Sequence, residues 1–269
     1  MKQQAAVQAV LAAAIGCPEV RAVFLKGSLA KGISDEHSDV DFYCLVEPEL
    51  LESFLEKRLS LLERYRPVIY HSESNFVGPQ MVAVFDDGLH FDLYTVTEET
   101  FPLVGAFQAL HDPHKLLGKF SDLTKDHGIN TDQLVTTFSE FSFTLLEFLA
   151  AWQRQDLVWA HRLTSHLAGD LGVVLRYRHD PGNARLGSKR LEQMLPLNKK
   201  QELRNALLDS GQNLPRTVLA LCRLLQEAML AIATEQALQL DWRLFQLMTA
   251  RIAECRPLDS SADGQQHIC

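Results

Sequence analysis

The chain has 269 residues, 46% of them hydrophobic and 22% charged, which is typical of a globular protein with a sizeable core. Lys and Arg total 26 against 34 Asp and Glu, a formal net charge of -8, and this acidic balance disfavours nucleic acid as a partner because nucleic-acid binding needs a basic face. Five scattered cysteines without a C-x-x-C pair and the absence of a window of roughly 18 uninterrupted apolar residues favour a cytoplasmic protein with no membrane partner.

The first 125 residues alternate short apolar runs with helical patterns. Residues 3–15 predict a helix rather than a signal peptide, and residues 48–64 predict another helix. Asp86-Asp87-Gly88 is typical of a hairpin turn. Strands are expected over 21–27, 39–46, 68–70, 81–85, 89–96 and 107–111. This mixture predicts an α/β (α+β) domain over 1–125, with a mixed sheet flanked by helices.

After residue 130 the sequence is dominated by helical periodicity. Asn198 with Gln201 resembles a helix-capping pair. Helices are expected over 131–153, 157–177, 188–194, 198–209, 215–233 and 238–255. The sequence therefore predicts a helical bundle domain over 126–257, followed by a polar tail, 258–269, that we expect to be disordered.

Two carboxylates stand on one predicted strand. Asp39 and Asp41 are two residues apart, so they point to the same face, while Val40 and Phe42 point into the core. Adjacent carboxylates repel each other unless a cation neutralises them. Mg²⁺ typically binds one or two carboxylates together with substrate phosphates, so this pair is a candidate magnesium site.

A phosphate-binding turn is predicted just upstream of this pair. Gly27-Ser28 lies where a strand gives way to a helix expected to begin near Leu29. Free backbone N–H groups at a helix start attract anions, Gly27 allows close approach of a phosphate, and the Ser28 hydroxyl can donate to it. Lys31 is near enough in sequence to add positive charge.

A third carboxylate interrupts a later apolar strand. Asp92 lies 51 residues after Asp41, within the run Leu89-His90-Phe91-Asp92-Leu93-Tyr94. An Asp buried without a partner is costly, and a metal or a hydroxyl substrate would explain it; the alternative is a strand-edge Asp that faces water. If the two strands are neighbours, Asp92 joins Asp39 and Asp41 on one face.

Together these residues resemble the DNA polymerase β-like nucleotidyltransferase superfamily. The stretch FLKGSLAKGISDEHSDVDFYCLV looks most like the small bacterial antibiotic nucleotidyltransferases, especially the lincosamide group, with the aminoglycoside (kanamycin-type) enzymes a looser match. The motif similarity is concentrated in residues 21–96, and the helical half is similar only in size and pattern.

The resemblance implies a mechanism. Asp39, Asp41 and Asp92 would be the catalytic carboxylates and the ligands of Mg²⁺ on the triphosphate of ATP or another nucleotide. Asp92 would be the general base on an acceptor hydroxyl, which attacks the α-phosphorus as pyrophosphate leaves. Gly27 and Ser28 would hold the outgoing phosphates. The product would carry a nucleoside monophosphate, AMP if ATP is used, and the acceptor would be a small hydroxylated molecule such as a lincosamide or aminoglycoside antibiotic.

The helical half offers further candidates. Lys189 and Arg190 could reach the triphosphate, or could belong to a solvated basic face. Glu140 and Glu147, seven residues apart on one helix face, could face solvent or a cationic antibiotic.

Two rival functions remain open: a nucleotidyltransferase acting on a protein or RNA acceptor, and a catalytically silent nucleotide-binding regulatory module. Three neighbouring acidic residues count against the silent module. Either a monomer or a homodimer is compatible with the sequence.

Overall fold

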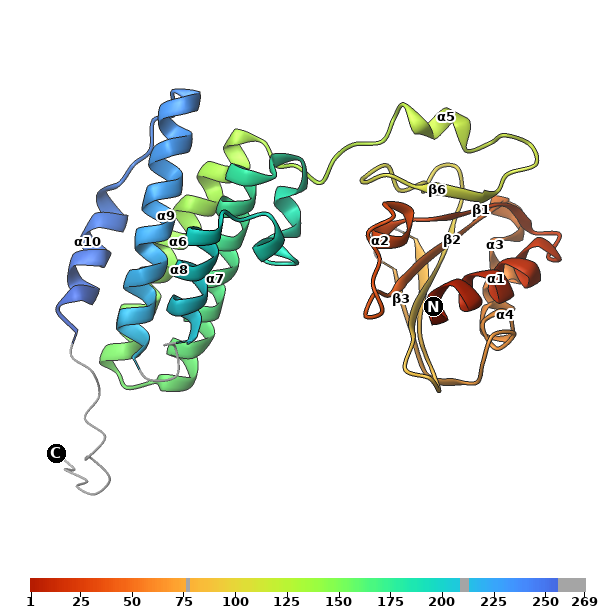
Figure 1. Ribbon diagram of the computed structural model, residues 1–269, viewed down its shortest axis with the longest axis horizontal. Helices are drawn as coiled ribbons and strands as arrows, with labels where there is room; N and C mark the ends of the chain where they lie inside the picture. Colours follow the sequence, from red (N-terminus) through yellow and green to blue (C-terminus); the bar gives the residue numbers. More distant parts are fainter. Residues whose placement is uncertain (76–77, 209–212, 256–269) are drawn as a thin grey trace, which may run out of the picture. The chain divides into compact units, whose positions relative to one another are not determined.

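The computed structural model of the chain describes residues 1–75, 78–208 and 213–255. The chain divides into two compact units, Met1–Asp126 and His127–Cys269, both drawn in Figure 1. The tail predicted over 258–269 lies outside the described residues.

The first unit is built on a six-stranded mixed sheet. The strand order is β3-β4-β5-β2-β1-β6. The strands are β1 (Val20–Leu25), β2 (Val40–Val46), β3 (Val68–Asn75), β4 (Pro79–Phe85), β5 (His90–Val96) and β6 (Gln108–His111). β2 and β5 pair in parallel and the other neighbours are antiparallel. The predicted α+β class and mixed sheet are confirmed.

Alternation along the central strands gives the sheet two buried faces. On one face Phe42, Phe91 and Leu93 pack against α1 (Lys2–Ile15), α3 (Leu51–Leu55) and α4 (Arg58–Leu62). On the other face Phe24 and Tyr43 are covered by Phe101 and Phe120, from the segment that leads into α5 (Gly118–Ser121). This second core covers only part of its face, and polar side chains occupy the end where β2 and β5 begin.

The predicted bounds of one helix and one strand in this unit were wrong. The helix predicted over 48–64 is divided into a 3-10 turn, η1 (Pro48–Leu50), followed by α3 and α4. At the break between α3 and α4, Nε of the buried Arg58 donates to the Leu55 carbonyl. This bond takes the place of the backbone hydrogen bond that a continuous helix would form at that carbonyl. β3 runs on to Asn75 because its polar, largely exposed residues form an edge strand, which an apolar pattern does not reveal.

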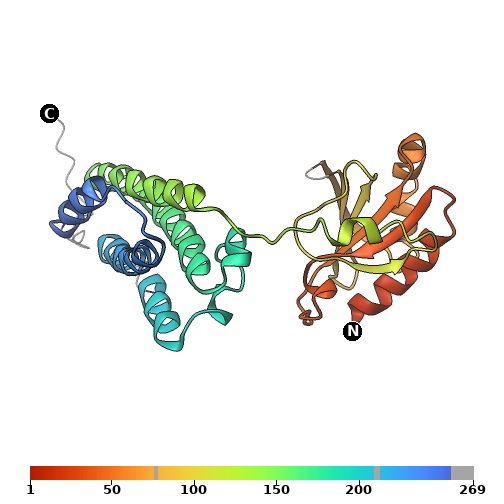
Figure 2. The same ribbon diagram turned by 90° about the horizontal axis from the view of Figure 1, so that it is seen from above.

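The second unit is a bundle of helices. They are α6 (Thr131–Gln153), α7 (Leu157–His179), the 3-10 turns η2 (Pro181–Leu186) and η3 (Leu191–Gln193), α8 (Leu197–Leu208), α9 (Leu214–Gln236) and α10 (Arg243–Ala253). α7 packs against α6 and α9, α8 packs against α9, and α10 packs against α6 and α9 (Figure 2). The core is formed by apolar stripes such as Leu134, Phe138, Phe141, Leu145 and Phe148 of α6.

Local hydrogen bonds set the ends of the helices, and α6 has the predicted bounds. α6 begins with a capping box in which the side chains of Asn130 and Gln133 each accept from the other's backbone N–H. The capping pair predicted at Asn198 was wrong, because α8 already begins at Leu197. α10 begins at Arg243, whose N–H donates to the Asp241 carboxylate.

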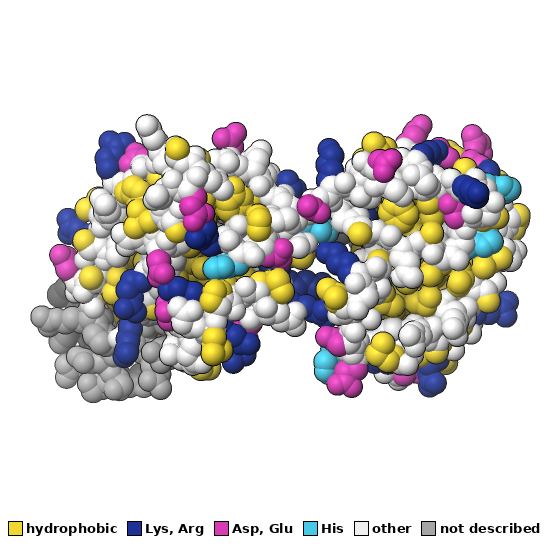
Figure 3. All heavy atoms as spheres, turned by 45° about the horizontal axis from the view of Figure 1, so that its top comes forward, with side chains coloured by type: hydrophobic (Ala, Val, Ile, Leu, Met, Phe, Trp, Pro, Cys, Tyr) yellow, Lys and Arg dark blue, Asp and Glu magenta, His cyan; other side chains and the backbone are white. Residues whose placement is uncertain are grey.

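Two bundle helices are notably apolar. α6 and α9 are long and apolar enough to cross a membrane by length and composition alone, but 50% of each apolar window is buried inside the structure. Because these side chains form the bundle core, the two helices have the properties of core helices in a globular unit. Apolar side chains are also exposed on both units (Figure 3). Exposed apolar residues include Ile69 and Tyr70 on β3 and Val158 and Trp159 on α7.

Candidate active site

The predicted carboxylates lie on two neighbouring parallel strands. Asp41 of β2 is directly opposite Asp92 of β5. Because side chains alternate along a strand, Asp39 and His90, two residues earlier, are on that same face. Val40 and Phe42 are fully buried on the opposite face. The structure therefore brings Asp39, Asp41 and Asp92 to one face of the sheet.

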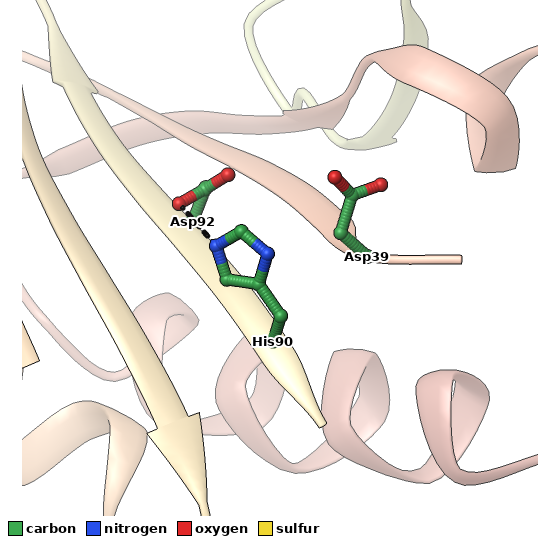
Figure 4. A group of neighbouring side chains, drawn as sticks. All are labelled: Asp39, His90 and Asp92. Carbon is green, nitrogen blue, oxygen red and sulfur yellow. Dashed lines mark hydrogen bonds and ion pairs between the residues drawn. The ribbon is translucent and has the colours of Figure 1, made fainter. Parts of the chain in front are cut away.

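Asp39, His90 and Asp92 form a tight cluster of metal-ligating groups. One ligand atom from each lies within 4.8 Å of the other two, and the His90 imidazole is hydrogen-bonded to Asp92 on the side of that residue nearer Asp39 (Figure 4). Asp92 is 7% exposed, and its Oδ1 is 3.1 Å from Nε2 of His90. Asp39 is half-buried just before β2. His90 is a site residue that sequence reasoning missed, although its position two residues before Asp92 was the signal for it.

This donor set fits a divalent cation. Ligand atoms about 2.1 Å from an ion are separated by at most roughly 4 Å, so small rotations of Asp39 and Asp92 would bring their oxygens into range. Carboxylate oxygens are the ligands that Mg²⁺ prefers, and an imidazole nitrogen is also accepted by transition metals. Of the three predicted metal ligands, this cluster contains Asp39 and Asp92, and it includes His90 in place of Asp41.

Asp41 is held against Gly27. A Cβ built on Gly27 would lie 2.0 Å from Oδ2 of Asp41, and the backbone φ of Gly27 is +64°. Residues with a side chain rarely adopt that φ, and no side chain would leave room for the carboxylate. Gly27 is therefore required both for the turn after β1 and for the position of Asp41.

Ser28, the residue after Gly27, contributes a buried hydroxyl. Gly27 and Ser28 open α2 (Gly27–Ala30), so this short helix begins at Gly27, not near Leu29 as predicted. Oγ of Ser28 is buried and has no hydrogen-bond partner, which is unfavourable for a hydroxyl unless a ligand supplies one. Lys31, at the C-terminal end of α2, is exposed.

Lys26 is a second residue that sequence reasoning missed. Its ammonium is buried and donates to the carbonyls of Pro102, at 2.7 Å, and Gly105, at 3.1 Å. Its backbone N–H donates to the Asp41 carbonyl at 3.0 Å. Burial lowers the pKa of Lys26 to about 8, an effect that the negative charge of Asp41 opposes. Lys26 thus fastens the 102–105 segment beside the site.

An aromatic pair continues the carboxylate face toward the core. Tyr43 lies opposite Tyr94 in the parallel register, and their rings stack with centroids 4.3 Å apart. Burial, together with the charges of Asp92 and Asp41, raises the pKa of Tyr94 to about 12. At neutral pH its hydroxyl is therefore protonated.

The basic candidates of the helical half belong to the second unit. Lys189 is exposed and Arg190 half-buried, in the segment between η2 and η3. Buried Arg176 orders this segment by donating to the carbonyls of Gly187 and Lys189 and by pairing with Asp180. Arg176 therefore has a structural role in shaping the loop that carries Lys189 and Arg190.

Comparisons with known proteins give a limited result. No family model matches the chain, and no curated protein matches it. Among solved structures, the chain is similar to an aminoglycoside 6-adenyltransferase from Bacillus subtilis, with 14% identity, a TM-score of 0.39, and coverage of 95% of this chain and 99% of that chain. It is also similar to a spectinomycin adenyltransferase from Enterococcus faecialis crystallised with ATP and spectinomycin, with 12% identity, a TM-score of 0.35, and coverage of 94% and 99%. Both scores are low, so the case for a function rests on the residues of this chain.

Proposed function

We propose that this chain is a nucleotidyltransferase that transfers a nucleoside monophosphate from a nucleoside triphosphate to a hydroxyl of a small molecule and releases pyrophosphate. The observation that carries this proposal is the parallel register that sets Asp41 opposite Asp92. Ligand atoms of Asp39 and Asp92 lie within 4.8 Å of each other, and the turn at Gly27 lies against Asp41. Three carboxylates on one face of the sheet, with an unpartnered buried hydroxyl in the turn that Asp41 contacts, are suited to a metal-bound phosphate substrate.

Asp39, Asp41 and Asp92 would hold Mg²⁺. When bound, the ion would neutralise charge on the triphosphate during transfer. Asp41 and Asp92 are anchored on the central strands β2 and β5, and Asp39 directly precedes β2, so these carboxylates would fix where the nucleotide binds. The contact between Asp41 and the Gly27 backbone links the phosphate-binding turn to the carboxylates.

Asp92 would act as the general base. Its carboxylate is nearly buried and is oriented by His90, so it can accept the proton of an acceptor hydroxyl. The acceptor oxygen forms a bond to the α-phosphorus, the bond from that phosphorus to the β-phosphate oxygen breaks, and pyrophosphate leaves. The Ser28 hydroxyl and Lys31 would bind the departing phosphates.

We infer that ATP is the donor and that the acceptor is an antibiotic of the lincosamide or aminoglycoside type. The motif resemblance in residues 21–96 and the net charge of -8 support a cationic, hydroxylated acceptor. All four cysteines that the structure describes are free thiols, in keeping with a cytoplasmic enzyme.

The test is incubation of the full chain with Mg²⁺, each of the four nucleoside triphosphates and a panel of hydroxylated antibiotics. Mass spectrometry then seeks a nucleoside monophosphate adduct. An adduct that forms with wild type and not with Asp92→Asn supports the proposal. Pyrophosphate release without an adduct on any antibiotic indicates another acceptor, such as a protein or RNA. Nucleotide binding without turnover under any condition indicates a binding module and contradicts the proposal.

A further inference from the structure

We propose that His90 is itself a metal ligand, so that Asp39, His90 and Asp92 form a mixed oxygen–nitrogen centre that binds a first-row transition dication in preference to Mg²⁺. This inference extends the proposed function, and any role of His90 in catalysis rests on that function. It concerns the metal-binding chemistry of three side chains and can be measured without any nucleotide.

The first support is the geometry of the cluster. His90 is the first residue of β5 and Asp92 is the third, so both project from one face of one strand toward Asp39 at the start of β2 (Figure 4). The ligand atoms of all three lie within 4.8 Å of one another. An ion among them needs an adjustment of about 1 Å at most, given the roughly 4 Å limit set by metal–ligand bond lengths.

The second support is the orientation and accessibility of the imidazole. Nε2 of His90 points at Oδ1 of Asp92, 3.1 Å away, so it already faces the place that an ion bound by Asp92 would occupy. The His90 side chain is 45% exposed, whereas that of Asp92 is 9% exposed. The imidazole therefore lies on the open side of the cluster, where it can turn from the Asp92 oxygen to an entering ion.

The third support is ligand preference. Mg²⁺ is a hard ion that prefers carboxylates, phosphates and water. An imidazole nitrogen adds little to Mg²⁺ binding and more to the binding of transition dications, whose affinity for nitrogen-containing sites rises from Mn²⁺ through Co²⁺. A site with one imidazole and two carboxylates should therefore bind transition dications more tightly than Mg²⁺. A site made only of carboxylates should show a smaller difference in affinity between these ions.

The experiment is Mn²⁺ binding to the full chain without nucleotide, followed by electron paramagnetic resonance, with Mg²⁺ as competitor. Pulsed measurements detect the nitrogen of a directly bound imidazole by its coupling to Mn²⁺. The variants are His90→Ala and His90→Gln, and the matched control is His71→Ala. His71 is exposed on β3 and projects from the opposite face of the sheet, because its neighbour Ser72 is in register with Val82 and Asp92.

The expected result is a nitrogen coupling in wild type and in His71→Ala that is lost in both His90 variants. Mn²⁺ affinity should fall roughly tenfold or more in those variants, while Mg²⁺ affinity changes less than threefold. A wild-type spectrum without nitrogen coupling, or a coupling that survives in the His90 variants, overturns the proposal. An equal loss of Mn²⁺ and Mg²⁺ affinity also overturns it, because His90 would then only position Asp92. None of these readouts depends on nucleotidyl transfer, so a failure here is distinguishable from a failure of the proposed function.

Discussion

Replacing Gly27 with Ala tests the link between the phosphate-binding turn and the carboxylates. The substitution has two separable effects. Gly27 has a φ of +64°, and an alanine in this left-handed region costs about 1–2 kcal/mol. In addition, the new Cβ would lie 2.0 Å from Oδ2 of Asp41, so one of the two must move.

The magnitude of the second effect follows from contact distances. A methyl carbon and an oxygen need a separation of at least about 3 Å, so the Asp41 carboxylate has to retreat by about 1 Å. A displacement of that size at a reacting centre lowers the rate on the order of 100-fold. We therefore expect Gly27→Ala to lose a few degrees of thermal stability and most of its transfer activity.

Gly88→Ala is the matched control. Gly88 has a φ of +75° in the β4–β5 turn, and a Cβ there would meet nothing within 4 Å. It should lose as much thermal stability as Gly27→Ala and keep its activity. The assay is pyrophosphate release at saturating substrates, with melting followed by circular dichroism. The reasoning is refuted if Gly27→Ala retains activity within threefold of Gly88→Ala.

Three further substitutions test single interactions. Ser28→Ala removes a buried hydroxyl that has no partner. We expect unchanged stability and a roughly fivefold higher KM for the nucleotide, because one hydrogen bond of about 1 kcal/mol to the phosphate is lost. An unchanged KM would argue against a contact between Ser28 and the phosphates. Lys26→Met leaves the carbonyls of Pro102 and Gly105 without their donor; urea unfolding should show a loss of about 2–4 kcal/mol, and a loss under 1 kcal/mol would show that the tether matters little. The third substitution concerns Asp170, whose pKa burial raises to about 6 in the folded chain. Between pH 4 and 6 the folded state therefore binds more protons than the unfolded state. Wild type consequently loses stability as the pH rises through that window. Asp170→Asn, which stays neutral, should be more stable than wild type by up to about 3 kcal/mol at pH 7 and no more stable below pH 4; a difference independent of pH would contradict this assignment.

The sheet and the carboxylates could be predicted because local rules decide them. The alternation in Asp39-Val40-Asp41-Phe42 indicates both a strand and which side chains share a face. That Asp92 lies beside them depends on β2 and β5 being neighbours, and their parallel pairing is a long-range contact with no signal in the sequence. The sequence therefore predicted that Asp92 joins Asp39 and Asp41 only if the two strands are neighbours. The strand order of the structure meets that condition.

The residues that were missed owe their importance to tertiary structure. His90 was visible next to Asp92, but its nearness to Asp39 depends on the strand pairing. Lys26 looked like the polar end of a strand, and its burial results from the 102–105 segment closing over it. Likewise, the break near Arg58 arises from the burial of a guanidinium that pairs with Glu73 across the unit, which helical periodicity alone cannot indicate.

The most direct test of the central claim is the stoichiometry of transfer in wild type and in Asp92→Asn. With Mg²⁺, nucleoside triphosphate and an acceptor that is modified, wild type should form one pyrophosphate for each nucleoside monophosphate adduct. Asp92→Asn should still bind the nucleotide but form both products about 10²–10⁴-fold more slowly. Equal rates in the two proteins would contradict a catalytic role for the carboxylates on β2 and β5.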